Sequence, residues 1–254
     1  MGRRTRYTPG TPCAVDLVTP DRDAAKGFYG ELFGWSAEDL EHGYMAFGLD
    51  GAVVAGAIAL TEEAAAAGTP PNWTTYIAVA DVEAAVARVT ELGGTVMGAV
   101  FEIPGAGRGA AFTDPQGALL LLWEAAGFAG AELVNGPGRW AWNDLQTADP
   151  KAALPFYEQL FGWTFEEIAE SHGLYWTITH EGRTIGGVLR ASETPHPFWA
   201  VYFGVPSVDA AREQIAAAGG HHLAGPFTVP NGRFALQADP QGAVFAIVQG
   251  TYDD

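Results

Sequence analysis

Apolar and polar positions follow two periods along the chain, and together they predict alternating strands and helices. Short alternating or apolar runs predict strands at 14–19, 44–49, 52–60, 74–79, 95–101, 109–113 and 119–124. Apolar side chains three and four positions apart predict helices at 21–32 and 81–92, with Gly34 ending the first and Asp81 capping the second. We therefore assign two βαβββ units to the first half of the chain.

The second half repeats the first. The motif Phe-Tyr-x-x-Leu-Phe-Gly-Trp at 28–35 recurs at 156–163, and Asp-Pro-Gln-Gly-Ala at 114–118 recurs at 239–243. Three further matches keep the same order: Asp16-Leu17 with Asp144-Leu145, Trp73 and Tyr76 with Trp199 and Tyr202, and Gly93-Gly94 with Gly219-Gly220. Five matches in one order indicate a tandem duplication.

The duplication predicts the layout of the whole chain. Helices of the second copy are expected at 150–160 and 208–218. We divide the chain into a first domain at 9–125, a linker at 126–138 that is rich in Gly and Ala, and a second domain at 139–250. Each domain then holds two βαβββ units.

The Phe-Tyr…Leu-Phe-Gly-Trp helix end and the Asp-Pro-x-Gly turn resemble the vicinal-oxygen-chelate superfamily, which includes glyoxalases, bleomycin-resistance proteins and extradiol dioxygenases. The two-domain form looks like the actinobacterial tandem type often labelled hydroxylase. The resemblance implies an α+β fold in which the two βαβββ units of each domain form one cupped mixed sheet, with the ligand in the cup. Because the same cup serves isomerases, dioxygenases, thiol transferases and drug-binding proteins, the resemblance names no reaction.

Metal-dependent members of this superfamily carry a His or Gln on the first strand of each unit and a Glu on the last strand. Alignment on the motifs puts six residues at those positions: Ala14, Thr74, Leu121, Trp142, Ala200 and Ala246. A divalent ion needs three or four nitrogen or oxygen ligands that converge, and of these six only Thr74 offers even a weak one. We therefore expect no metal and no cofactor, which counts against a metal-dependent glyoxalase or dioxygenase.

Strand alternation predicts which side chains face each cup. In the first domain these are Ala14, Asp16, Val18, Thr74, Tyr76, Ala78, Leu119, Leu121 and Trp123. In the second domain they are Trp142, Asp144, Gln146, Tyr202, Val244 and Val248. These linings are mostly apolar or aromatic, which suits a planar, largely hydrophobic ligand held by a few polar contacts.

Asp16 and Asp144 are unusual because aspartate is disfavoured in strands, yet one recurs at this place in both copies. One interpretation makes each an acid or base with a raised pKa, assisted by Tyr76 or Tyr202 as a proton donor. The other makes each a brace for the sheet. The first cup is the better candidate for function, because Trp142 fills space beside Asp144.

The remaining repeated residues have structural interpretations. Asp114 and Asp239 are expected to form turns. Trp35 and Trp163 are expected to fill the cores beside their helices. Trp73 and Trp199 point away from the cups and are expected to pack at a domain interface.

Charge and composition narrow the partners. The net charge of −17 disfavours nucleic acid and anionic membranes as partners. With Cys13 as the one cysteine, no intrachain disulfide can form, and the apolar runs are too short to span a bilayer, so a cytoplasmic protein is expected. The duplication would allow a monomer with the internal symmetry of a dimer.

Two functions stay open. The first is a metal-independent binding protein for an aromatic natural product or antibiotic, in secondary metabolism or resistance. The second is a metal-independent tailoring enzyme, such as a cyclase, isomerase or hydroxylase helper, that uses Asp and Tyr for acid–base chemistry.

Overall fold

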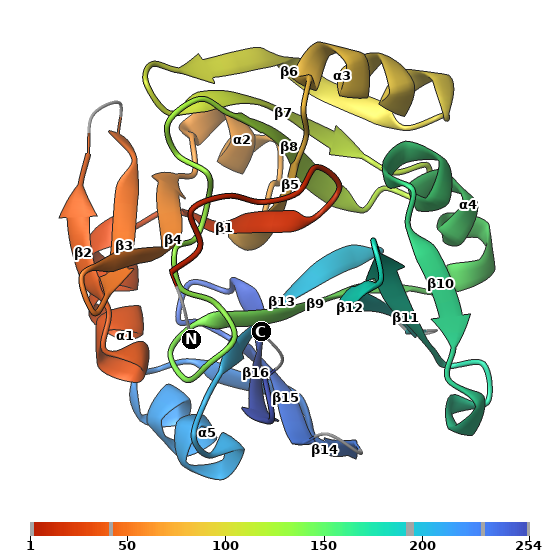
Figure 1. The fold of residues 1–254 in the computed structure, drawn as a ribbon. Coiled ribbons are helices and arrows are strands. Elements are labelled where there is room, and N and C mark those ends of the chain that lie inside the picture. The colour runs from red at the N-terminus through yellow and green to blue at the C-terminus, as the bar shows by residue number, and fades with distance from the viewer. Residues whose placement is uncertain (1–2, 41–42, 192–195, 230–231, 253–254) are drawn as a thin grey trace.

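The computed structural model describes residues 3–40, 43–191, 196–229 and 232–252, and it folds as four βαβββ units (Figure 1). The first domain holds β1 (Pro12–Thr19), α1 (Arg22–Phe33), β2 (Ser36–Asp39), β3 (Met45–Leu49), β4 (Ala52–Ala59), α2 (Glu62–Ala66), β5 (Asn72–Ala78), α3 (Val82–Glu91), β6 (Thr95–Ile103), β7 (Gly107–Thr113) and β8 (Leu119–Ala125). The second holds β9 (Trp140–Thr147), α4 (Pro150–Phe161), β10 (Thr164–Glu167), η2 (Ala169–Ser171), β11 (Tyr175–His180), β12 (Arg183–Arg190), β13 (Phe198–Gly204), α5 (Val208–Ala217), β14 (His221–Val229), β15 (Gly232–Ala238) and β16 (Val244–Gly250). The apolar pattern predicts no range for β2, β10, α2 or η2, because these short elements have mostly exposed residues and no apolar period.

Each domain curls one mixed sheet into a cup, as predicted. In the first domain the strands lie in the order β2-β3-β4-β1-β5-β8-β7-β6, with β1 antiparallel to β5 and each of these two parallel to the last strand of its own unit. The second domain repeats this order as β10-β11-β12-β9-β13-β16-β15-β14. The two sheets meet where Val244 of β16 pairs with Asn72 of β5.

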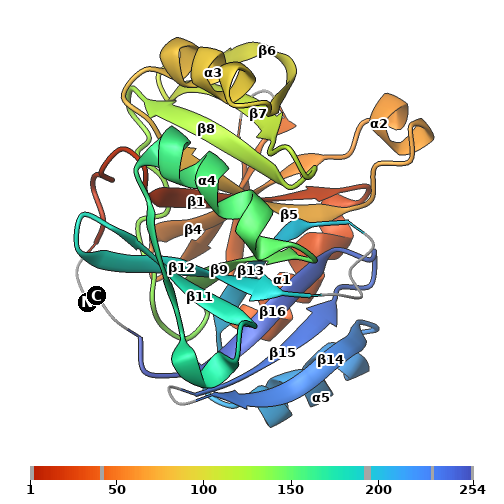
Figure 2. The same ribbon diagram turned by 90° about the vertical axis from the view of Figure 1, so that its right-hand side faces the viewer.

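The helices cover the convex faces of the sheets and bring the domains together. Figure 2 shows α3 over β6–β8 and α5 beneath β14 and β15, while α2 projects from the body. Helix α1 contacts α5, and α3 contacts α4, so each helix pair joins one unit of the first domain to one unit of the second.

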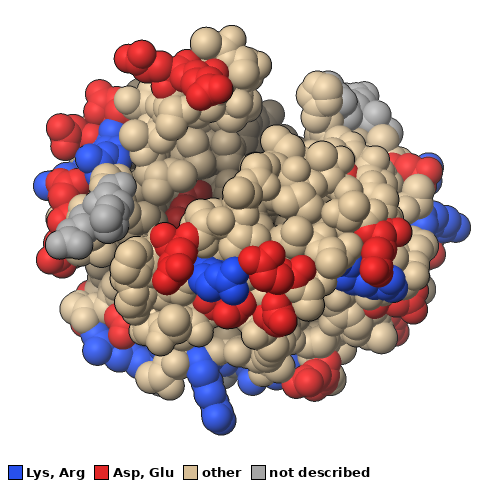
Figure 3. All heavy atoms as spheres, turned by 90° about the horizontal axis from the view of Figure 1, so that it is seen from above, with Lys and Arg blue, Asp and Glu red and all other residues tan. Residues whose placement is uncertain are grey.

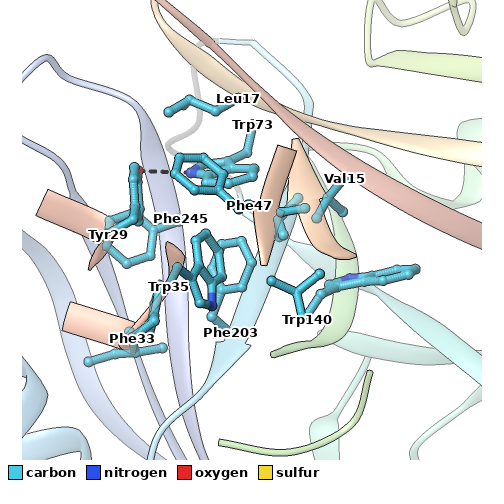
Figure 4. Close-up of a cluster of buried hydrophobic side chains, with 14 of the residues drawn as sticks. Val15, Leu17, Tyr29, Phe33, Trp35, Phe47, Trp73, Trp140, Phe203 and Phe245 are labelled. Carbon is cyan, nitrogen blue, oxygen red and sulfur yellow. Dashed lines mark hydrogen bonds between the residues drawn. The ribbon is translucent and has the colours of Figure 1, made fainter. Parts of the chain in front are cut away.

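The hydrophobic cores lie between the domains. In one core, Tyr29 and Trp35 of the first domain pack with Phe203 and Phe245 of the second (Figure 4). A matching core joins the second unit of the first domain to the first unit of the second domain. Aromatic pairs of this kind add about 0.5–1.5 kcal/mol each beyond their buried area. The prediction for the four tryptophans is confirmed: all are at most 5% exposed in these two cores, Trp35 and Trp73 in one and Trp163 and Trp199 in the other.

Asp114 and Asp239 form the predicted turns, and they also bind across the domain interface. Oδ1 of each accepts the backbone N–H groups two and four residues on, which shapes the Asp-Pro-Gln-Gly turn. Oδ2 of Asp239 accepts the hydroxyl of Tyr29 at 3.0 Å, and Oδ2 of Asp114 accepts that of Tyr157 at 2.8 Å. These reciprocal bonds relate the two halves like the subunits of a symmetric dimer.

The surface is acidic. In the space-filling view from the side of α3 and β6, carboxylates and basic side chains lie mixed around a deep hollow (Figure 3). Across the described ranges, no helix is long and apolar enough to cross a membrane.

Candidate functional site

The two central strands of each domain form the floor of its cup, and their register sets two rows of side chains. In the first cup, one row is Gly56, Asp16 and Thr74, and the other is Ala14, Tyr76 and Leu121. In the second cup the matching rows are Gly187, Asp144 and Ala200, and Trp142, Tyr202 and Ala246. The structure thus brings the predicted Asp and Tyr residues of each cup together.

Asp16 is held by two tyrosines. Its side chain is 4% exposed; Oδ1 accepts the Tyr44 hydroxyl at 2.9 Å, and Oδ2 accepts the Tyr76 hydroxyl at 2.8 Å. The backbone of Gly56 also donates to this carboxylate. A Cβ at Gly56 would overlap both the Tyr44 hydroxyl and Asp16 Oδ1, so glycine is needed for the close approach of these groups.

Burial controls the charge of Asp16. Desolvation raises the pKa of this carboxyl to about 6, while the hydrogen bonds from Tyr76, Tyr44 and Gly56 lower it and so limit the rise. Near neutral pH Asp16 is therefore mostly ionised but close to its titration range. A carboxylate in this state can accept a proton or a hydrogen bond from a ligand.

The first cup is otherwise apolar. Ala14, Tyr76, Ala78 and Trp123 are at most 8% exposed and form one cluster with the half-buried Leu121. Val18 and Leu119 are also half-buried, at the ends of β1 and β8, and the Thr74 hydroxyl donates to Asn72 at 2.7 Å.

Two segments outside the sheet also enter this cluster. Tyr7 precedes β1, and Phe128 lies in the linker. The Tyr7 hydroxyl donates to the carbonyl of Ala131, and Trp123 Nε1 donates to that of Phe128. The linker is therefore part of the wall of the first cup and does more than connect the domains.

The second cup holds its aspartate differently. Asp144 is also 4% exposed, and its Oδ1 accepts the Tyr175 hydroxyl and Trp142 Nε1, both at 2.8 Å. The crowding of Asp144 by Trp142 that the sequence suggested is thus a hydrogen bond. Burial raises the pKa of Asp144, and the nearby Tyr175 hydroxyl, Tyr202 hydroxyl and Trp142 indole N–H counter that rise.

Tyr202 and Gln146 complete the floor of the second cup without hydrogen-bond partners. They are 3% and 5% exposed, and neither the Tyr202 hydroxyl nor Gln146 Nε2 has a partner in bonding geometry among the described residues. Half-buried Trp142, Phe198, Phe234 and Val248 surround them, and Val244 lies half-buried at the start of β16.

Sequence reasoning missed Tyr44, Tyr175, Gly56 and Gly187. Tyr175 follows Tyr44 by 131 positions, and Gly187 follows Gly56 by the same 131. The recognised repeats run at offsets of 125 to 128, so an insertion before β11 hides this match. A repeat comparison that allowed a gap there would have found both pairs.

These residues do not fit a divalent metal ion. Each cup contributes one carboxylate, and hydrogen bonds from neighbouring side chains already engage it. The other positions in the two rows of each cup are occupied by Ala, Gly, Leu, Thr, Tyr and Trp residues. Within the described part of the chain, no group of three His, Cys, Asp or Glu residues is placed to hold a metal.

Each half of the chain matches a known protein family. Residues 13–122 match the Glyoxalase/Bleomycin resistance protein/Dioxygenase superfamily, and residues 129–248 match a Glyoxalase-like domain. The chain is 43% identical to "Putative glyoxylase CFP32" of Mycobacterium tuberculosis (strain CDC 1551 / Oshkosh), over 98% of both chains. It is 34% identical to "Anthracycline biosynthesis protein DnrV" of Streptomyces peucetius, over 96% of this chain and 95% of that one.

Solved structures share the fold at low sequence identity. The Mn(II)-bound glyoxalase from Novosphingobium aromaticivorans superposes with a TM-score of 0.64 at 18% identity, covering 98% of this chain and 83% of that one. The 2,3-dioxygenase LapB from Pseudomonas sp. KL28 also gives 0.64, at 14% identity, covering 95% and 92%.

Proposed function

Because the chain belongs to the glyoxalase/bleomycin resistance protein/dioxygenase superfamily, we propose that it is a metal-independent protein that binds planar aromatic natural products in its cups. The observation that carries this proposal is the buried Asp–Tyr–Tyr cluster in an apolar floor, beside Ala14, Thr74 and Leu121, the positions at which the resemblance places metal ligands. The relatives named for anthracycline biosynthesis support an aromatic ligand and a role in secondary metabolism.

The lining favours such a ligand on physical grounds. Trp123 and Tyr76 present aromatic rings in the first cup, and Trp142, Tyr202 and Phe234 do so in the second. Flat rings stack favourably on these faces. An acidic chain with one buried carboxylate per cup disfavours anionic ligands and favours neutral or cationic ones.

A tailoring enzyme is the second candidate, and the state of Asp16 favours it. A carboxylate with a pKa of about 6, between the hydroxyls of Tyr44 and Tyr76, is suited to move a proton at neutral pH. In this scheme Asp16 and Asp144 act as base and Tyr76 and Tyr202 as donor. The ligand-contacting residues would be Ala14, Val18, Thr74, Leu119, Leu121, Trp123, Trp142, Gln146, Val244 and Val248.

We further propose a monomer that works in the cytoplasm. The two domains already bury their apolar convex faces against each other, so a second chain is not needed to cover them. Cys13 is buried and free, as expected for a protein that needs no disulfide.

Titration with neutral and cationic anthracyclines tests the binding proposal. Binding should quench tryptophan fluorescence stoichiometrically, and W123F and W142F should each remove the part of the quenching that arises in one cup. Absence of quenching and of calorimetric heat across the panel would contradict the proposal. Mass spectrometry of the recovered compounds separates the candidates: unchanged compounds favour a binding protein, and turnover that D16N abolishes favours the enzyme.

A further inference from the structure

Two polar groups on the floor of the second cup lack hydrogen-bond partners in bonding geometry among the described residues, and both can donate hydrogen bonds. The Tyr202 hydroxyl and Gln146 Nε2 are enclosed by protein, beside the apolar cluster of the second cup and close to Asp144. A buried donor without a partner costs about 1–3 kcal/mol. Such groups are rare in native proteins and call for an explanation.

The Tyr202 hydroxyl differs from the matching hydroxyl of the first cup. There the matching Tyr76 donates to Asp16. In the second cup Trp142 occupies the place of Ala14, and its indole N–H donates to Asp144 Oδ1, the oxygen that also accepts the Tyr175 hydroxyl. Burial and the nearby Asp144 raise the pKa of the Tyr202 hydroxyl, and the nearby Gln146 amide lowers it, so the hydroxyl lies close to both side chains.

Gln146 is also particular to this cup. Val18 stands at the matching place in the first cup and carries no polar atom in its side chain. The second cup therefore presents two adjacent donors, Tyr202 and Gln146, that the first cup lacks.

Resting on the proposed function, we infer that the second cup is selective for planar ketones and quinones, whose carbonyl oxygen accepts hydrogen bonds from the Tyr202 hydroxyl and the Gln146 amide. A carbonyl oxygen has two lone pairs and can accept both bonds. A carboxylate would meet the buried Asp144 and the net charge of −17, so a neutral acceptor is favoured.

Aromatic side chains lead from these donors to the surface. The rings of Tyr202 and Phe234 lie 5.7 Å apart, those of Phe234 and Phe227 lie 5.2 Å apart, and Phe227 is 46% exposed. In the first cup Gly109 stands in the place of Phe234, opposite Phe101. Since the donor atoms are enclosed, ligand binding to them requires half-buried side chains of the lining to move.

Two matched cationic probes test this inference by calorimetry: 2-(aminomethyl)anthraquinone and 2-(aminomethyl)anthracene. They share ring shape and charge, and they differ in the two carbonyl groups. The quinone should bind about tenfold more tightly. In Y202F and in Q146V, which places the first-cup residue in the second cup, the ratio of the two dissociation constants should fall toward one.

The controls separate the possible failures. Both variants remove an unpartnered polar atom, so they should fold. Q159A, which removes an exposed amide on α4 far from the cups, should keep the tenfold ratio. Equal binding of the two probes, or a ratio that survives in Y202F and Q146V, would overturn this inference alone. If neither probe binds, the proposed function is overturned with it.

Discussion

The two cups descend from one duplicated design and keep the same aspartate, the same pair of tyrosines and the same close-packed glycine. They differ in what surrounds that cluster. In the first cup the two tyrosines bind one carboxylate oxygen each, whereas in the second Tyr175 and Trp142 share Oδ1 of Asp144. The shared parts hold a buried charge in place, and the differences decide which polar groups stay available to a ligand.

Substitutions at Gly56 and Gly187 test whether the aspartate and tyrosine side chains are packed equally closely in the two cups. G56A and G187A would each push a methyl group into a tyrosine hydroxyl and an aspartate oxygen. Overpacking and a broken buried hydrogen bond should together lower the free energy of unfolding by about 3–5 kcal/mol in each variant. Urea denaturation measures this loss.

A matched control exists on α1. Gly27 is exposed in the helix and a Cβ there would meet nothing within 4 Å, so G27A should raise the free energy of unfolding by about 0.5–1 kcal/mol. If G187A were tolerated as well as G27A, the second cup would not be built like the first.

The aspartates predict a pH dependence of stability. The pKa of Asp16 is about 6 in the folded protein and 3.8 when unperturbed, so between these values the folded state holds more protons. The protein should therefore lose about 3 kcal/mol of stability as pH rises through this window. In urea denaturation from pH 4 to 7, D16N should remove the pH dependence of the free energy of unfolding that Asp16 causes. D144N should also reduce the pH dependence, because burial raises the pKa of Asp144 as well.

The exposed Asp209 should affect the pH dependence of stability in the opposite direction. Pairing with Arg233 lowers the pKa of Asp209, so its small contribution is present at neutral pH and is lost as pH falls. D209N should leave the slope due to Asp16 in place. A D16N protein with the parent's full slope would show that burial of Asp16 does not set it.

Much of the fold could be read from the sequence. The 3.6-residue period at 21–32 and the Asp-Pro-Gln-Gly turns fixed the order of elements, because helices and turns depend on local chemistry. Asp16 and Tyr76 were found because both recur and both face the cup by strand alternation. Their contact, at 2.8 Å, depends on the pairing of β1 with β5.

The parts of the site that the sequence did not predict depend on contacts between distant segments of the chain. Tyr44 reaches Asp16 only because β4 lies between them in the sheet and Gly56 leaves room. Tyr7 and Phe128 enter the first cup from segments with no periodic pattern. The pairing of Asp239 with Tyr29 spans 210 positions, and no local signal distinguishes such a bond from an ordinary turn.

The smallest predicted effect on stability, that of removing a tyrosine hydroxyl, compares the two cups most directly. Y76F removes a hydroxyl that donates to a buried carboxylate, so it should lower the free energy of unfolding by about 1–3 kcal/mol and raise the pKa of Asp16 further. Y202F removes a hydroxyl that has no partner in bonding geometry among the described residues, so the same change should cost less than about 0.5 kcal/mol or stabilise the protein slightly. Both variants delete one buried oxygen from equivalent places, so unfolding at pH 7 compares them without other differences in chemistry. Equal losses would mean that Tyr202 binds Asp144 in solution as Tyr76 binds Asp16, and that the two cups have the same polar floor.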